Sequence, residues 1–477
     1  MKNKYLFLLT GAFILCSFLV NAQEFAITNN SSSYASSVAY DGTNYLMTMY
    51  ADSITKKVSV QLFNASGTLV GDRITIGTGG FPRVAFDGTN YLVVWHQYYH
   101  STSGSDGGET TGNVYGQFVS TSGNLIGSSF IVATGVSSRF YREATFAFND
   151  ATYFLVYATG GNDNENYILY GQRISKSGTL LNSPVLISSL KPREVNMAYD
   201  GTNYLVIWVE DTDGSYIDSD VYGQFVSKTG ELVGSNFTID DDDYASDNPT
   251  SIAFDGSRYL VSFHDASPDD HELWNLYARF ISTSGIVSDR VVIANATQHP
   301  TQAMLAFDGT NYLATWIITS GTFDIVGRYF STSGAAIDPT FTLFEYQGNK
   351  VSMGGVYFYS KDGFFIGVTK ESYENGSFVN GDVYGMFLKS TSTGIPDIKT
   401  NNKSLTIYPN PVTDVFIASG FEGTATLNLS DINGRLLFTK EITVGETVPV
   451  NSLLNGVYIA TIKSKGSTEI EKLIIHR

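Results

Sequence analysis

Over most of the chain, apolar and polar residues alternate in short runs, and Asp-Gly or Ser-Gly pairs separate the runs. Alternation with a period of two is typical of half-buried β-strands, and these dipeptides are typical of the tight turns that join them. After residue 22, no segment approaches the roughly 18 consecutive apolar residues that a membrane-spanning helix needs. The pattern therefore predicts an all-β protein built from short strands, with no membrane span.

The alternating segments also repeat as sequences. One phrase has the form VAFDGTNYLVVW and occurs, with substitutions, at residues 38–50, 84–95, 146–157, 197–208, 252–263, 305–316 and 356–368. Each copy is followed by a second phrase of the form VYGQFVSTSG, which has diverged in the first copy, at 58–67. Together the two phrases and their turns predict four short strands. The chain therefore contains seven repeats, numbered 1 to 7 below, with strands called first to fourth.

Repeat 7 has no fourth strand of its own. Earlier repeats end with strand-like segments such as SFIV at 129–132 and NFTI at 236–239, whereas repeat 7 runs directly into a polar segment. A segment of the missing kind, Glu24–Ile27, lies instead near the start of the chain. If it fills the gap, the repeats close into a ring with no open end, as in propellers. We therefore predict a seven-bladed β-propeller over residues 23–393, closed by its N-terminal strand.

Residues 1–22 have the features of a signal peptide. Lys2 and Lys4 precede an apolar run, and the small residue Ala22 ends the segment. The single cysteine, Cys16, lies inside it, so the exported protein has no thiol for disulfides, thiolate catalysis or cysteine metal sites.

The formal charge of −17 becomes −19 when the two lysines are removed. This acidity argues against a nucleic-acid partner and favours cations or neutral polymers.

The composition changes at residues 394–404, a polar linker, and residues 405–477 then read as a small antiparallel β-sandwich. Four motifs follow one another along this segment: LTIYPNPVTD at 405–414, LSDINGRLL at 429–437, LLNGVYIATI at 453–462 and KLIIHR at 472–477. These motifs resemble the type A C-terminal sorting domain of the type IX secretion system of Bacteroidetes. The resemblance implies that the type IX machinery is a partner, which carries the protein across the outer membrane after Sec export. A secreted or cell-surface protein is therefore expected.

Loops between the second and third strands, and links between repeats, vary in length, and in a propeller both lie on one face. The charged residues between Glu210 and Glu272 are almost all acidic. Candidate metal ligands there are Asp211, Asp213, Asp240, Asp241, Asp242, Asp269 and Asp270. Clustered carboxylates repel one another, and Ca²⁺, which takes about six to eight oxygen ligands, would relieve that repulsion. The alternative is solvated loops screened by salt, and the sequence leaves both open.

The same face carries the candidate ligand-binding residues His96, Tyr98, Tyr99, Glu210, His264 and Asp265. The two histidines occupy the same position at the ends of their second strands, where they could hydrogen-bond a sugar or act as bases. Bonding to the nearby backbone is the alternative. Tyr98 and Tyr99 belong to a long insertion in repeat 2, and they either stack on sugar rings or pin that loop. No catalytic motif such as G-x-S-x-G occurs.

Three functions remain open at this point. The sequence favours a binding or adhesion protein for an extracellular glycan or protein, with or without calcium, because of the export signals and the variable face. A secreted hydrolase or lyase that degrades polysaccharide is the second. A rigid surface spacer with no small ligand is the third. The fold alone does not decide between them, because propellers carry unrelated activities.

Overall fold

The computed structural model divides the chain into two compact units, Met1–Ser390 and Thr391–Arg477, called unit 1 and unit 2 and described separately here. Every named element is a β-strand, and no helix in the described part of the chain is long and apolar enough to cross a membrane. The predicted signal peptide, up to residue 21, and the predicted linker lie outside the described residues. The described residues are 22–29, 32–51, 56–98, 111–137, 144–160, 168–189, 192–211, 219–241, 248–267, 270–295, 297, 299–319, 323–337, 339–345, 350–360, 363–374, 377–388, 406–410, 412–419, 423–431, 436–453, 455–464 and 467–475.

Each of repeats 1 to 6 forms four antiparallel strands whose order in the sheet follows the sequence, and a single residue pair joins the sheets of repeats 2 and 3. Repeats 1 to 3 comprise β2 (Ser33–Tyr40), β3 (Asn44–Ala51), β4 (Lys57–Asn64) and β5 (Leu69–Thr78); β6 (Gly80–Phe86), β7 (Asn90–Tyr98), β8 (Thr111–Ser120) and β9 (Leu125–Ser137); β10 (Thr145–Phe148), β11 (Thr152–Thr159), β12 (Ile168–Ser175) and β13 (Leu180–Ser188). Repeats 4 to 6 comprise β14 (Pro192–Tyr199), β15 (Asn203–Asp211), β16 (Ser219–Ser227) and β17 (Leu232–Asp240); β18 (Asn248–Phe254), β19 (Arg258–Ser267), β20 (Asp270–Ser282) and β21 (Val287–Ala294); β22 (Pro300–Phe307), β23 (Asn311–Ile318), β24 (Asp324–Ser331) and β25 (Phe341–Phe344). Repeat 7 comprises β26 (Lys350–Ser360), β27 (Gly363–Glu374) and β28 (Ser377–Leu388), followed in the sheet by β1 (Ala22–Ala26).

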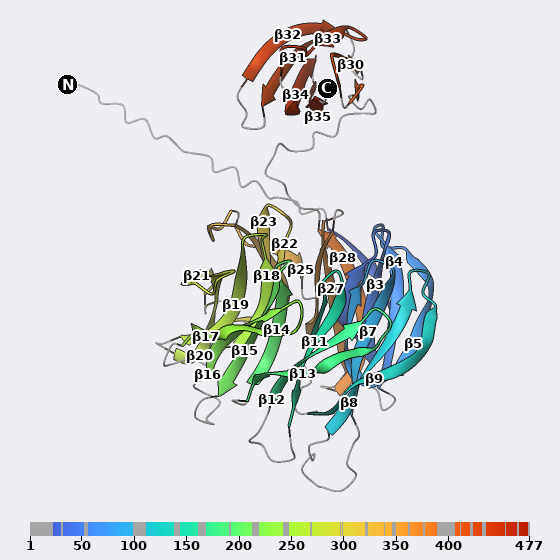
Figure 1. The fold of residues 1–477 in the computed structure, drawn as a ribbon, viewed down its shortest axis with the longest axis vertical. Helices are drawn as coiled ribbons and strands as arrows, with labels where there is room; N and C mark the ends of the chain where they lie inside the picture. The colour runs from blue at the N-terminus through green and yellow to red at the C-terminus, as the bar shows by residue number, and fades with distance from the viewer. Residues whose placement is uncertain are drawn as a thin grey trace, which may run out of the picture. The chain divides into compact units, whose positions relative to one another are not determined.

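The first strands of neighbouring repeats contact one another in a closed circle. Strand β2 contacts β6, and the contacts continue through β10, β14, β18, β22 and β26 back to β2. In Figure 1 the sheets follow one another in the order of the chain, and the orange strand β28 lies near the blue strands of repeat 1. The apolar clusters lie between adjacent sheets, since each contains residues from two successive repeats. Unit 1 is therefore an all-β, propeller-like structure.

The turns between first and second strands are nearly identical. In repeat 1 the Asp41 carboxylate accepts hydrogen bonds from the N–H groups of Thr43 and Asn44, both at 2.7 Å. The glycine that follows Asp41 has a φ of 99°, which glycine adopts without a steric penalty. The same bonds recur at Asp87, Asp200, Asp255 and Asp308. We call the end of the sheets that carries these turns the uniform edge.

Strand β1 completes the sheet of repeat 7, which confirms the prediction that the N-terminal segment closes the ring. It pairs antiparallel with β28 and places Phe25 opposite Gly385. The Ile27 N–H donates to the Val383 carbonyl at 2.8 Å, and the Val383 N–H donates to the Thr28 hydroxyl at 2.9 Å. These last two residues are 355 positions apart in the sequence, so the contact joins the two ends of unit 1.

The Phe25 ring is packed against two glycines. A Cβ on Gly385, in its own sheet, or on Gly67, in the next repeat, would lie 2.6 Å from the ring. Phenylalanines of other fourth strands have the same surroundings, with Phe130 against Gly116 and Gly178, and Phe237 against Gly223 and Gly285. The Phe–Gly contact therefore connects repeat 2 to repeat 3 and repeat 4 to repeat 5, and β1 supplies it between repeat 7 and repeat 1.

The outer strands contain a bulge that a glutamine side chain holds. In repeat 1 the pairing of β4 with β5 slips next to Gln61, and Gly71 has a φ of 66°. The Gln61 amide donates to the carbonyls of Leu62, Val70 and Gly71 at 3.0, 3.3 and 3.1 Å. Equivalent bonds are made by Gln117, Gln172 and Gln224. A bulge of this kind bends the strand and interrupts its regular edge.

Unit 2 consists of two sheets that share one apolar core. One sheet contains β29 (Thr406–Tyr408), β30 (Val415–Ser419) and β33 (Thr447–Pro449), and the other contains β32 (Leu436–Thr443), β31 (Thr424–Asp431), β34 (Gly456–Ser464) and β35 (Ser467–Ile475). Phe416 and Val448 of the first sheet and Leu427 and Ile462 of the second belong to the same buried cluster. This arrangement agrees with the predicted small antiparallel sandwich.

Replacement of Phe25 by alanine is expected to lower the free energy of unfolding by about 3 kcal/mol, because it removes the ring that fills the space beside Gly67 and Gly385. Urea unfolding of the purified protein measures this change. Ile131→Ala, in the fourth strand of repeat 2, is the matched control: Ile131 is 46% exposed, so its truncation should change stability little. Equal effects of the two substitutions would contradict a special role for β1.

Candidate functional site

The second strands end, and the first strands begin, at the edge of unit 1 opposite the uniform edge. Gly80 pairs with His96, and Asn248 pairs with His264. Glu210 lies at the same end of β15. The backbones of Tyr98, Asp211 and Asp265 follow at the ends of their strands. We call this the variable edge, because the links and loops that differ between repeats meet it.

His96 and His264 are both buried at the variable edge. Their exposed fractions are 6% and 9%. Burial lowers the pKa of each imidazole to about 4, although hydrogen bonds to the backbone of Val136 and Pro300, respectively, favour the charged form. Both rings are therefore neutral near pH 7. His96 is bonded within its own repeat, at the end of β9, whereas His264 connects its repeat to Pro300 at the start of the next one. A role in ligand binding stays a prediction for both.

Glu210 is a buried carboxylic acid, with 2% of its surface exposed. Its Oε1 accepts hydrogen bonds from the Ser188 hydroxyl at 2.7 Å and from the Trp208 indole N–H at 2.8 Å. Burial raises the pKa of Glu210; the two donors oppose this shift, and the carboxylate of Asp220, on the paired strand β16, adds to it. Because Ser188 belongs to repeat 3, Glu210 links repeats 3 and 4 at the variable edge.

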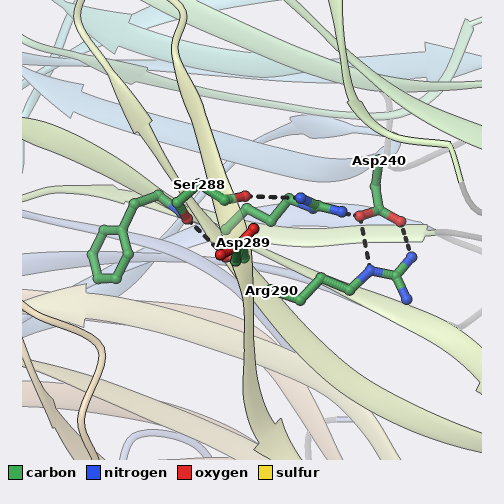
Figure 2. Close-up of polar contacts among 6 residues, drawn as sticks. Asp240, Ser288, Asp289 and Arg290 are labelled. Atoms are coloured by element: carbon green, nitrogen blue, oxygen red, sulfur yellow. Dashed lines mark hydrogen bonds and ion pairs between the residues drawn. The ribbon is translucent and has the colours of Figure 1, made fainter.

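Asp240, a predicted metal ligand, is instead enclosed by two arginines (Figure 2). Its Oδ1 accepts from the Nε of Arg279 at 2.5 Å and from the Nε of Arg290 at 3.0 Å, and its Oδ2 accepts from Nη2 of Arg290. The Arg279 Nη1 also donates to the Ser288 carbonyl at 2.8 Å. Asp240 is 1% exposed. Two guanidinium groups already balance its charge, so we assign Asp240 to an ion pair between repeats 4 and 5 and not to a cation site.

The remaining acidic candidates are only partly defined by the structure. Asp241 is exposed, and Asp211, Asp265 and Asp270 are described by their backbones alone. The predicted residues Tyr99, Asp213, Asp242 and Asp269 lie outside the described residues. Within the described ranges, no group of three or more His, Cys, Asp or Glu side chains is arranged to hold a metal ion. Calcium binding at these loops therefore stays a prediction.

The two arginines around Asp240 show what the sequence reasoning missed. They follow Glu272 in the chain, so a count of charges in one acidic segment leaves them out, although the sheet brings them onto that segment. One signal was present: Arg279 stands at the position where other repeats have the glutamine that holds the bulge, such as Gln61. A substitution at a repeated position marks a repeat-specific contact.

Unit 2 is identified by comparison with protein families. Residues 406–476 match the family described as the secretion system C-terminal sorting domain. The match supports the predicted type IX sorting domain, and the protein is therefore secreted by the type IX system to the cell surface or the extracellular space. Unit 1 is the cargo that this domain carries.

Solved structures resemble the chain in fold. One is a polysaccharide lyase, an ulvan lyase bound to -[GlcA(1-4)Rha3S]-, which is 10% identical with a TM-score of 0.52 over 77% of this chain and 96% of that chain. A second polysaccharide lyase is also 10% identical, with a TM-score of 0.49 over 77% of this chain and 99% of its own. Among curated proteins, none matches the chain. At this identity the first likeness concerns the fold alone, and it agrees with a propeller-like cargo.

The buried histidines predict a loss of stability in acid. An imidazole whose pKa is about 4 in the folded protein and about 6.5 in the unfolded chain binds its proton first in the unfolded state. Its stabilising contribution is full above pH 6.5 and is lost as the pH falls toward 4, by about 3 kcal/mol per histidine. Unfolding of His264→Asn, followed between pH 7 and 4, should show a weaker pH dependence than the unsubstituted protein.

His96→Asn is expected to weaken the pH dependence to a similar extent, because both rings have the same burial and the same lowered pKa. The two effects should add, since the residues lie in different repeats. An unchanged pH dependence in both variants would show that neither ring is held neutral by burial.

Removal of the Asp240 charge should destabilise unit 1. Asp240→Asn leaves two arginines, whose side chains are only 23% and 19% exposed, without their counter-charge, which costs about 3 kcal/mol. Asp289→Asn is the matched control, because Asp289 is exposed on the strand that carries Arg290. Thermal unfolding distinguishes the two. A variant as stable as the control would show that the ion pair contributes nothing.

Proposed function

We propose that unit 1 is a seven-bladed β-propeller and that the protein acts at the cell surface or in the extracellular space as a binding or adhesion protein, with an extracellular polysaccharide as the favoured ligand. The observation that carries this proposal is the contrast between the two edges. One edge repeats a single turn, and the other collects side chains that differ between repeats. Variable residues on a rigid scaffold are where binding usually evolves.

The choice of polysaccharide over protein has separate support. The secretion route delivers the protein outside the cell, and a solved structure of similar fold is a lyase bound to a saccharide. The likeness concerns the fold, so the saccharide is a hypothesis for this chain and not a transferred property. Calcium at Asp211, Asp213, Asp241, Asp242, Asp269 and Asp270 belongs to the same proposal, and clustering of these acids in the sequence is its only support.

The second candidate is a polysaccharide-degrading hydrolase or lyase. In its favour is Glu210, a buried acid with a raised pKa at the variable edge, opposite a second carboxylate. General acids often have raised pKa values of this kind. The Ser188 and Trp208 bonds explain Glu210 as a structural link, so binding without turnover remains the stronger proposal.

Binding without turnover is the expected result when the purified protein is titrated with polysaccharides in a calorimeter and the products are assayed for reducing ends and unsaturated sugars. Repeating the titration with CaCl₂ and with a chelator tests the metal. Asp211→Ala, Asp265→Ala and His264→Ala serve as comparison variants. Product formation that one of them abolishes would favour the enzyme, and no binding at all would favour a spacer.

A further inference from the structure

Three aromatic rings form a cluster, which we call the stack, at the variable edge of repeats 1 and 2. Tyr34, on β2, lies opposite Tyr50, on β3, with ring centroids 5.5 Å apart and planes 24° from parallel. The Tyr50 ring also contacts that of Phe81, on β6, at 4.8 Å and 41°. All three residues are half-buried, so each presents part of its surface to solvent. The stack joins two repeats at the edge where the function is proposed to lie.

These rings are not part of the packing that the repeats share. The repeated tyrosine of the second strand, Tyr45 in repeat 1, is fully buried, as are its counterparts. Tyr50 follows it by five residues, and the residues at that position in repeats 2 to 7 are His96, Ala158, Val209, His264, Ile317 and Thr369. The aromatic residue is therefore specific to repeat 1. A side chain that departs from the repeat on a variable edge is a candidate for ligand contact.

The backbone at this stack is held in an uncommon conformation. Phe81 has a φ of 51°, and Lys56, in the neighbouring loop, has a φ of 39°. The Gly79 N–H, two residues before Phe81, donates to the Lys56 carbonyl at 2.7 Å and fixes the two segments together. Glu194, at the corresponding position of repeat 4, has the same φ of 51°, so this conformation belongs to the bulge of the first strand. In repeat 2 it holds the Phe81 ring against Tyr50.

Two basic residues lie close to the three rings along the chain, in a protein of formal charge −17. The Lys56 backbone is bonded to Gly79, two residues before Phe81. The Arg83 guanidinium donates to the carbonyl of Ser36, two residues after Tyr34, at 3.3 Å. Bases beside aromatic rings suit a ligand that combines a flat apolar face with negative charge. Pyranose rings that bear carboxylate or sulfate groups have both features.

We propose that Tyr34, Tyr50 and Phe81 form a stacking site for a pyranose ring of an anionic polysaccharide. This inference rests on the proposed binding function and gives it a place and a ligand class. The C–H face of the sugar packs on the aromatic surface while its hydroxyls remain in water, and Lys56 and Arg83 attract its charged group.

The test uses the full exported chain and calorimetric titration with polygalacturonate, alginate, dextran sulfate and neutral dextran. At least one anionic polymer should bind more tightly than dextran. Tyr50→Leu and Phe81→Leu should each weaken that binding by about tenfold, because leucine keeps apolar volume but has no flat ring. Phe81→Tyr should retain the affinity, which separates loss of stacking from loss of folding.

Tyr40→Leu is the matched control, since Tyr40 is a half-buried tyrosine at the other end of β2, on the uniform edge. It should bind as tightly as the unsubstituted protein. Tight binding in the Tyr50 and Phe81 variants would overturn the stacking site and leave the binding function standing. Failure of the unsubstituted protein to bind any of the polymers would overturn both.

Discussion

The contact of Phe25 with Gly67 and Gly385 is the constraint on which unit 1 depends. Each sheet buries its apolar faces only against its neighbours, so an open arrangement would leave the first and last sheets exposed. The contact must bring together segments from opposite ends of the unit, and the entropy of closing so long a loop has to be offset at this place. The stability of every repeat is therefore linked to one short N-terminal strand.

The two edges of the closed ring differ in the kind of contact that holds them. At the uniform edge, the aspartate carboxylate of each Asp-Gly turn accepts hydrogen bonds from backbone N–H groups. Loss of the aspartate would therefore have a similar effect in whichever of these turns it occurs. At the other edge, contacts between repeats are made by side chains that differ from one junction to the next, as with Glu210, Asp240 and His264. These contacts stabilise individual junctions, and they can differ between repeats because the repeated turns and the closing strand define the ring.

Much of the fold could be predicted because the sequence of one repeat unit occurs several times in the chain. The strands, the turns and the place of β1 could be predicted, since a repeated phrase with one missing segment permits few arrangements. The site was harder to predict, because burial decided it: His96 and His264 looked like surface groups, and their rings lie inside. Asp240 looked like part of an acidic cluster, but its partners come from strands that are distant in sequence. Local patterns do not contain contacts of that kind.

The glutamine-held bulges have a consequence for how copies of the exported protein can associate. The fourth strand of repeat 1, β5, lies at the border of its sheet, and such borders readily recruit a strand from another molecule. The Gln61 amide occupies carbonyls there, and the kink beside Gly71 makes the border irregular. An edge that is kinked and partly occupied in this way is a poor template for a strand of another molecule, so the bulges work against edge-to-edge pairing between copies of unit 1.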